Sequence, residues 1–237
     1  MLRHLLSIFR TDDPLGQLGN HFAEMLHLAR ELTVRAGDIY FSETPASPEE
    51  RTEIFQQDIQ INKLERRIRK GVIFFLSSHE NTPNLPYCLL LMSLVKDAER
   101  IGDYAKNLAE VDEIRPESLP DDEIVAEMKE LRMRVESVFA QTADVFAKSD
   151  QEEAIELIRQ GRELTHRCDL LVGRIARSEY DASSATATVL GTRYYKRIAA
   201  HILNVLSSVV MPLHKLDYYD ERVLEPGETT SQTPRAP

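Results

Sequence analysis

Four oxygen-bearing side chains at helical spacing are the strongest chemical feature of this sequence. Glu99 and Asp103 stand four residues apart, and so do Asp58 and Asn62 in an earlier segment. Residues four apart share one face of a helix, where two carboxylates repel each other by roughly 0.2–0.5 kcal/mol. Clustered oxygen ligands suit hard cations such as Mg²⁺, Ca²⁺, Mn²⁺ or iron. If the two segments form adjacent antiparallel helices, these four side chains make a candidate metal site.

A solvated helix face is the alternative interpretation of the same residues. Lys96, Arg100 and Lys106 lie close to the two carboxylates of the later segment and would relieve their repulsion. Spacing alone favours this interpretation, because runs of charge on a helix are usually exposed to water.

A diiron centre is a weaker alternative. Glu24 with His27 and Glu163 with His166 both have the Glu-x-x-His spacing of ferritin-like diiron proteins. With 24 Glu and seven His in the chain, roughly 0.7 such pairs are expected by chance, so two are unremarkable. Too few residues precede Glu24 to supply the Glu-bearing helix that a ferritin-like oxidase would need before it.

Composition limits the class of protein. The chain has 237 residues, 42% hydrophobic and 29% charged, which is typical of a soluble globular protein. A formal net charge of −10 argues against binding nucleic acid, which requires a basic surface. The two cysteines, Cys88 and Cys168, have no metal-ligand spacing and lie in apolar helical surroundings, so we expect buried free thiols, as in a reducing cytosol. No apolar run approaches the roughly 20 residues that span a bilayer.

Apolar residues recur at intervals of three and four along most of the chain, which predicts an all-α protein. Caps and prolines divide the sequence into six long helices. Their expected starts are near Pro14, at the capping box Ser47–Glu50, after residues 81–86, after residues 115–120, at a second box Ser149–Glu152, and after the polar run 181–188. We expect the last helix to end near Met211 and Pro212.

The two halves of the chain look like tandem copies of a three-helix unit. Arg100-Ile101 followed by Asn107 recurs with identical spacing as Arg197-Ile198 followed by Asn204. The sequence therefore predicts an antiparallel bundle of two three-helix repeats. The predicted divisions are a short basic segment 1–13, a first repeat 14–115, a second and degenerate repeat 120–216, and a disordered tail 225–237 that is rich in Thr, Pro and Gly.

Residues 97–110, DAERIGDYAKNLAE, resemble the third-helix signature of the PhoU family. That signature runs acidic-x-Glu-Arg-Ile-x-Asp-His/Tyr-x-x-Asn-Ile/Leu-x-Glu. Residues 58–65, DIQINKLE, resemble the second-helix motif of the same family. The resemblance covers about residues 14–216, in the correct order and with two repeats.

This resemblance implies a cytoplasmic, non-enzymatic regulator of phosphate uptake and phosphate signalling. Its implied partners are a phosphate transporter and a sensor histidine kinase, with a homodimer and at most peripheral membrane association also compatible. Some PhoU proteins bind iron or another metal through acidic-x-x-x-Asp pairs on the second and third helices. The matching residues here are Asp58, Asn62, Glu99 and Asp103.

The second half departs from the family pattern. Lys196 and Ala200 stand where Glu99 and Asp103 stand in the first half, while Thr165 and Asp169 stand roughly opposite Asp58 and Asn62. A lysine in a cation site would repel the ion. We therefore expect any metal in the first repeat only, and a divergent PhoU-domain protein or a helical scaffold without metal function remains an alternative.

Overall fold

Six long α-helices make up most of the structure, a computed structural model that describes residues 14–78, 82–115 and 118–216. No strand occurs in these ranges, which confirms the predicted all-α class. The predicted segments 1–13 and 225–237 lie outside the described residues. The helices are α2 (Pro14–Phe41), α3 (Pro48–Ser78), α4 (Leu85–Glu110), α5 (Glu123–Lys148), α6 (Gln151–Ile175) and α7 (Ala182–Val210), and short 3-10 turns follow at η2 (Thr82–Asn84), η3 (Val111–Glu113) and η4 (Leu213–Lys215).

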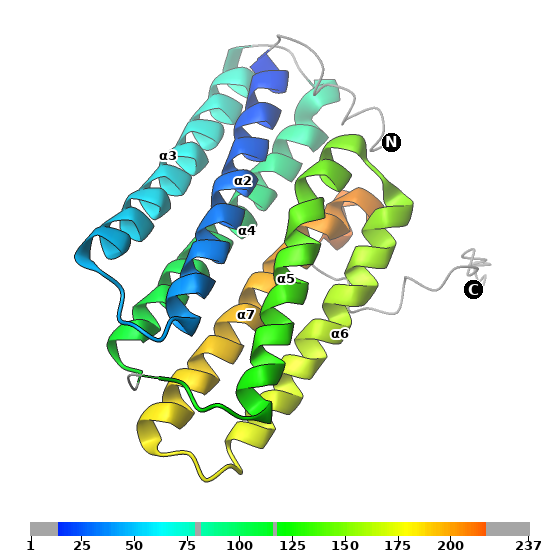
Figure 1. Cartoon of the computed structure of the whole chain (residues 1–237). Coiled ribbons are helices and arrows are strands. Elements are labelled where there is room, and N and C mark those ends of the chain that lie inside the picture. Colours follow the sequence, from blue (N-terminus) through cyan, green and yellow to red (C-terminus); the bar gives the residue numbers. More distant parts are fainter. Residues whose placement is uncertain (1–13, 79–81, 116–117, 217–237) are drawn as a thin grey trace, which may run out of the picture.

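The helices form an elongated antiparallel bundle of two three-helix repeats, as predicted (Figure 1). In the first repeat α3 packs against both α2 and α4, and in the second α6 packs against both α5 and α7. The repeats join through the α4–α7 and α2–α5 contacts. Because α3 and α6 contact only helices of their own repeat extensively, they form the two flanks of the bundle. None of the helices in the described ranges has the length and apolar character needed to cross a membrane.

The apolar seam of α4 fixes the orientation of the acidic stripe. Leu94, Ala98 and Ile101 are completely buried on this seam, and the other predicted members, Leu91, Ala105 and Leu108, are buried with them. Residues one to two positions away must then turn toward the edge of the core. This orientation places Glu99 and Asp103 at the partly exposed side of α4.

Capping interactions explain where two of the helices begin. At α3 the predicted capping box is confirmed: the Ser47 amide donates to Glu50 Oε2 at 2.8 Å, and the Glu50 amide donates to Ser47 Oγ at 3.1 Å. The backbone amide of Ser47 is the main cause of the lowered pKa of Glu50. The box predicted at Ser149–Glu152 is wrong. Ser149, at φ 53°, ends α5 in the left-handed conformation, and Asp150 caps α6 by accepting from the Glu153 amide at 3.2 Å.

Helix α7 begins earlier than the sequence pattern predicts. It starts at Ala182, inside the polar run that was expected to precede it. Asp181 caps it by accepting from the Ser184 amide at 2.8 Å. Thr188 Oγ1 donates to the Ser184 carbonyl at 2.6 Å, so its buried hydroxyl is satisfied within the helix. An apolar periodicity does not detect such a turn, because small polar residues face the neighbouring helix.

Candidate functional site

Helices α3 and α4 bring the predicted ligands to one side of the first repeat. The helices approach closely at Gly102, where a Cβ atom would lie 3.0 Å from Ile61 Cδ1. Across this contact, Lys106 of α4 reaches α3: its Nζ donates to Asp58 Oδ2 at 3.2 Å. The same ammonium lies 3.7 Å from Asp103 Oδ1. The Lys106 side chain thus lies between Asp58 of α3 and Asp103 of α4, which are both predicted ligands.

The remaining predicted ligands are also engaged by neighbours on their own helices. Asn62 Nδ2 donates to Asp58 Oδ2 at 3.3 Å. Glu99 accepts from Lys96 Nζ at 2.6 Å, and Asp103 accepts from an Arg100 nitrogen at 3.2 Å. The stripe that was predicted to be acidic is therefore a network of ion pairs, in which each carboxylate of α4 has a cationic neighbour.

Lys106 supplies the positive charge at the centre of this network of ion pairs. Its side chain is 23% exposed, and that of Asp58 is 6% exposed. Burial lowers the pKa of Lys106, but the carboxylates of Asp58, Asp103 and Glu110 raise it by more, so its pKa is raised overall. The group is consequently an ammonium ion at neutral pH and balances Asp58 without any bound metal.

The residues as placed here do not fit a metal ion. Within residues 14–78, 82–115 and 118–216, no three His, Cys, Asp or Glu side chains are grouped as a metal ion would require. A bound cation would also have to displace the Lys106 ammonium, which it would repel. Ligation of iron or another hard cation by Asp58, Asn62, Glu99 and Asp103 stays a prediction, and it requires Lys106 to move.

Replacing Lys106 by Met tests this assignment. We expect the affinity for Mn²⁺ to rise about tenfold or more, because a unit charge about 4 Å away contributes on the order of 1–4 kcal/mol near a protein surface. Isothermal titration calorimetry of both proteins measures the change. Adding Glu99→Ala and Asp103→Ala should abolish the gain, whereas Lys196→Met should produce none. Equal affinity in wild type and Lys106→Met would contradict the assignment.

In the second repeat, another lysine engages a carboxylate between the corresponding helices. Lys196 Nζ of α7 donates to Asp169 Oδ1 of α6 at 2.6 Å, and Arg193 lies 3.4 Å from the same oxygen. Thr165, opposite Asp58 in the repeat, donates its hydroxyl to the Arg162 carbonyl at 2.9 Å. Both flanking helices are therefore tied to the bundle by a lysine–aspartate pair.

The two Glu-x-x-His motifs do not assemble a diiron centre in the described structure. The His27 imidazole is exposed and lies 3.1 Å from Glu31 on the same helix. The exposed Glu163 carboxylate pairs with Arg134 at 3.3 Å. A diiron centre of a helix bundle needs these side chains to point into the core, and they point outward.

A buried polar junction between the repeats was not predicted from the sequence. Asp97, at the start of the signature segment, accepts from Asn204 Nδ2 at 2.8 Å, and His201 Nδ1 lies 2.8 Å from the same oxygen. The Tyr104 ring stacks on His201 with centroids 5.7 Å apart. Asn204 was recognised as the counterpart of Asn107, but its partner in the other repeat carries no signal in a single sequence.

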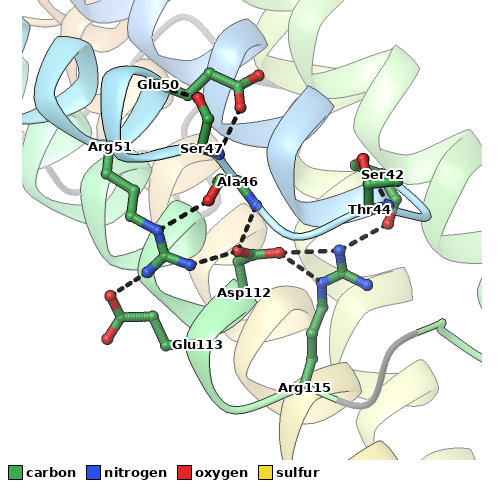
Figure 2. A network of polar contacts seen from close by, with 9 residues as sticks. All are labelled: Ser42, Thr44, Ala46, Ser47, Glu50, Arg51, Asp112, Glu113 and Arg115. Atoms are coloured by element: carbon green, nitrogen blue, oxygen red, sulfur yellow. Dashed lines mark hydrogen bonds and ion pairs between the residues drawn. The ribbon is translucent and has the colours of Figure 1, made fainter.

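A second unpredicted network closes one end of the first repeat (Figure 2). Asp112 follows α4 and accepts from the Ala46 amide and from Arg51 Nη2, both at 2.9 Å. Arg115 Nη2 donates to Asp112 Oδ1 at 2.9 Å and to the Ser42 carbonyl at 2.7 Å. The side chains of Arg115 and Asp112 are only 2% and 1% exposed. This network ties the α2–α3 loop to the end of α4.

Comparison with known proteins identifies the architecture. The family model described as the PhoU domain matches residues 15–111. The crystal structure of the phosphate transport system regulatory protein PhoU from Streptococcus pneumoniae superposes with a TM-score of 0.73 at 19% identity, covering 90% of this chain and 97% of that chain. PhoU from Pseudomonas aeruginosa gives 0.75 at 19% identity, covering 83% and 95%. Comparison with curated proteins gives no match. Residues 15–111 therefore match the PhoU domain, and the six helices of the chain adopt the fold of the PhoU structures.

Proposed function

We propose that the protein regulates phosphate transport by binding another protein, either a component of a phosphate transporter or a sensor histidine kinase. The observation that carries the proposal is the PhoU domain at residues 15–111, set in a chain whose whole fold resembles a phosphate transport regulatory protein. The similarity extends over nearly the full length of that relative.

Contact rather than catalysis is the proposed mode of action. The polar residues of the signature segment act mainly on the protein itself: Asp97 and Tyr104 join the repeats, and Lys106 pairs with Asp58. A rigid bundle whose α3–α4 and α6–α7 contacts are neutralised within the chain suits a module that presents a shaped surface to a partner.

The cytoplasm is the proposed location. Cys88 and Cys168 are both free and buried, as predicted. Burial raises the pKa of the Cys168 thiol to about 12, so this thiol is protonated and unreactive at neutral pH. Unpaired, inert thiols of this kind are compatible with a reducing compartment.

Affinity capture tests the proposed partners. The tagged full-length chain is recovered from cells of the source organism grown with plentiful or scarce phosphate, and the bound proteins are identified by mass spectrometry. We expect a phosphate transporter subunit or a sensor histidine kinase to be enriched over a tag-only control in at least one condition. Enrichment of neither class in either condition would contradict the proposal.

A metal-free scaffold is the second candidate, and the ion pairs favour it. Asp58, Glu99 and Asp103 each have a cationic neighbour within the chain. Thermal melting with and without the ion separates the metal-free scaffold from a metal-dependent regulator, because an ion that binds only the folded state raises the midpoint of melting. An increase of the midpoint with Mn²⁺ or iron would favour the metal-dependent regulator over the scaffold.

The predicted homodimer is a separate question, and light scattering of the purified protein measures it.

A further inference from the structure

The outward face of α3 carries an unusual concentration of positive charge. Lys63, Arg66, Arg67 and Lys70 are all exposed and recur at helical spacing, and we call them the cationic face of α3. Residues 63–78 contain five basic residues and a single acidic one, Glu65, in a chain of net charge −10. Positive charge is therefore gathered on one flank of an acidic molecule.

The four side chains of the cationic face differ from most cations of this protein in having no acidic partner. Among the described residues none of them forms an ion pair, whereas the partly exposed Arg69 of the same helix lies 2.9 Å from Glu65. Most cations elsewhere in the described residues pair with a carboxylate, as Lys106 and Lys196 do with aspartates. A row of uncompensated charges is a surface suited to an anionic partner.

Exposed apolar residues lie at the end of the bundle toward which this face runs. Ile73 and Phe74 follow one turn after Lys70 and are 61% and 70% exposed. Leu85 and Leu89, at the start of the adjacent α4, are also exposed. We call these four residues the apolar tip. Large apolar side chains exposed beside a basic stripe are typical of contact with a membrane interface.

The chain enters the bundle at this same end. Figure 1 shows that α2 begins, α3 ends and α4 begins together. The first ten residues, MLRHLLSIFR, are themselves basic and apolar, and Asp12 and Asp13 follow them before α2 begins. Two separate basic and apolar stretches of sequence are thus joined to one end of the molecule.

A second copy of the chain fits this surface poorly. In a two-fold symmetric dimer the same patch meets itself, so the cationic face would be placed against another cationic face. An anionic lipid bilayer provides both features that the surface needs, negative headgroups for the cations and an apolar layer for Phe74.

We propose that the cationic face of α3 and the apolar tip bind the surface of a membrane rich in anionic lipid. The arginines and lysines contact headgroup phosphates, and Ile73 and Phe74 insert at the level where headgroups meet acyl chains. The proposal is independent of the regulatory function, because it concerns a lipid surface and not a protein partner.

Vesicle flotation of the full-length chain tests the proposal. Vesicles of phosphatidylcholine and phosphatidylglycerol in equal parts are expected to carry the protein with them, and vesicles of phosphatidylcholine alone are not. Binding should weaken as salt is raised, because salt screens exposed charges. Equal binding to both vesicles, or no binding to either, would overturn the proposal.

Substitutions locate the binding surface. Arg66→Glu with Arg67→Glu should weaken binding to the anionic vesicles about tenfold or more, since each cation near such a surface contributes appreciably. Phe74→Ser should weaken it about tenfold through the lost apolar burial.

Matched controls come from the second repeat. Lys148→Glu with Arg159→Glu reverses two exposed cations of α5 and α6, and Met133→Ser removes an exposed apolar side chain of α5. These variants should bind as wild type does, and circular dichroism should show every variant folded. Loss of binding in the controls equal to that in the α3 variants would place the contact elsewhere. Binding to polyglutamate but not to anionic vesicles would identify an acidic polypeptide as the partner and overturn the lipid proposal.

Discussion

Arg115→Ala is expected to lower the free energy of unfolding by about 3–5 kcal/mol, the cost of removing one partner from a buried ion pair. Without Arg115, the carboxylate of Asp112 remains buried with one fewer cation, and the Ser42 carbonyl loses the 2.7 Å hydrogen bond that Arg115 donates. The α2–α3 loop is then held to the end of α4 mainly through Arg51 and the Ala46 amide. Urea unfolding followed by circular dichroism measures the loss.

The control for this variant is an exposed ion pair between α2 and α3, the two helices joined by the loop that the network holds. Arg35 pairs with Glu53 at the surface, so Arg35→Ala should cost at most about 1 kcal/mol. The double variant Asp112→Ala with Arg115→Ala should lose less than the sum of the two single variants, because each single change leaves the other charge buried alone. A loss for Arg115→Ala no greater than that for Arg35→Ala would contradict the proposed role of the network.

Tyr40→Ala is expected to cost a similar amount, about 3–5 kcal/mol, as large-to-small changes at buried aromatic residues do. The Tyr40 side chain is completely buried and reaches from α2 to α7, so it links the two repeats. Its hydroxyl donates to the Ala187 carbonyl at 3.0 Å. A Cβ atom at Gly191 would lie 2.4 Å from the Tyr40 ring, so only glycine leaves room for this ring.

Tyr40→Phe separates packing from hydrogen bonding where this side chain contacts α7. It keeps the ring and removes only the hydroxyl, so a loss of about 0.5–1.5 kcal/mol is expected in the same unfolding experiment. Equal losses for Tyr40→Phe and Tyr40→Ala would mean that the hydrogen bond, and not ring packing, holds α2 against α7. A loss below about 1 kcal/mol for Tyr40→Ala would mean that the contact of Tyr40 with α7 does not stabilise the fold.

The periodicity of apolar residues was sufficient to predict the architecture, because burial in a helix bundle follows the helical repeat directly. Leu94, Ala98 and Ile101 recur at helical spacing and are buried as that spacing requires. The start of α7 was missed for the opposite reason. Its first turns pack through small polar residues such as Thr188, whose hydroxyl is satisfied by the Ser184 carbonyl. The periodicity of apolar residues does not detect a helical turn that packs against its neighbours through small polar side chains.

The candidate site could be predicted only in part. Helical spacing correctly put Glu99 and Asp103 on one side of α4, facing away from its buried seam. Spacing within one helix does not tell which cation a neighbouring helix contributes, so the reach of Lys106 across to Asp58 could not be derived. The same limit applies to Asp97, whose partners Asn204 and His201 are about a hundred residues away in sequence. Contacts between repeats depend on tertiary packing and leave no local pattern.

These contacts change the interpretation of the signature segment. Carboxylates at helical spacing suggested a metal site, yet Lys96, Arg100 and Lys106 neutralise them within the chain. The solvated-face alternative is closer to the observed geometry, although the charges are more extensively paired than that alternative assumed. The segment therefore serves first to position helices, and the surface for the proposed protein partner is expected on the outside of the bundle.

The proposed regulation of phosphate transport is tested most directly by phosphate uptake in the source organism. Uptake of radiolabelled phosphate is measured in cells with the gene intact, deleted, or deleted and restored, after growth with plentiful and with scarce phosphate. We predict that deletion changes the rate of uptake, or its response to phosphate supply, and that the restored gene returns both to normal. Identical uptake in intact and deleted cells under both conditions would contradict the proposal.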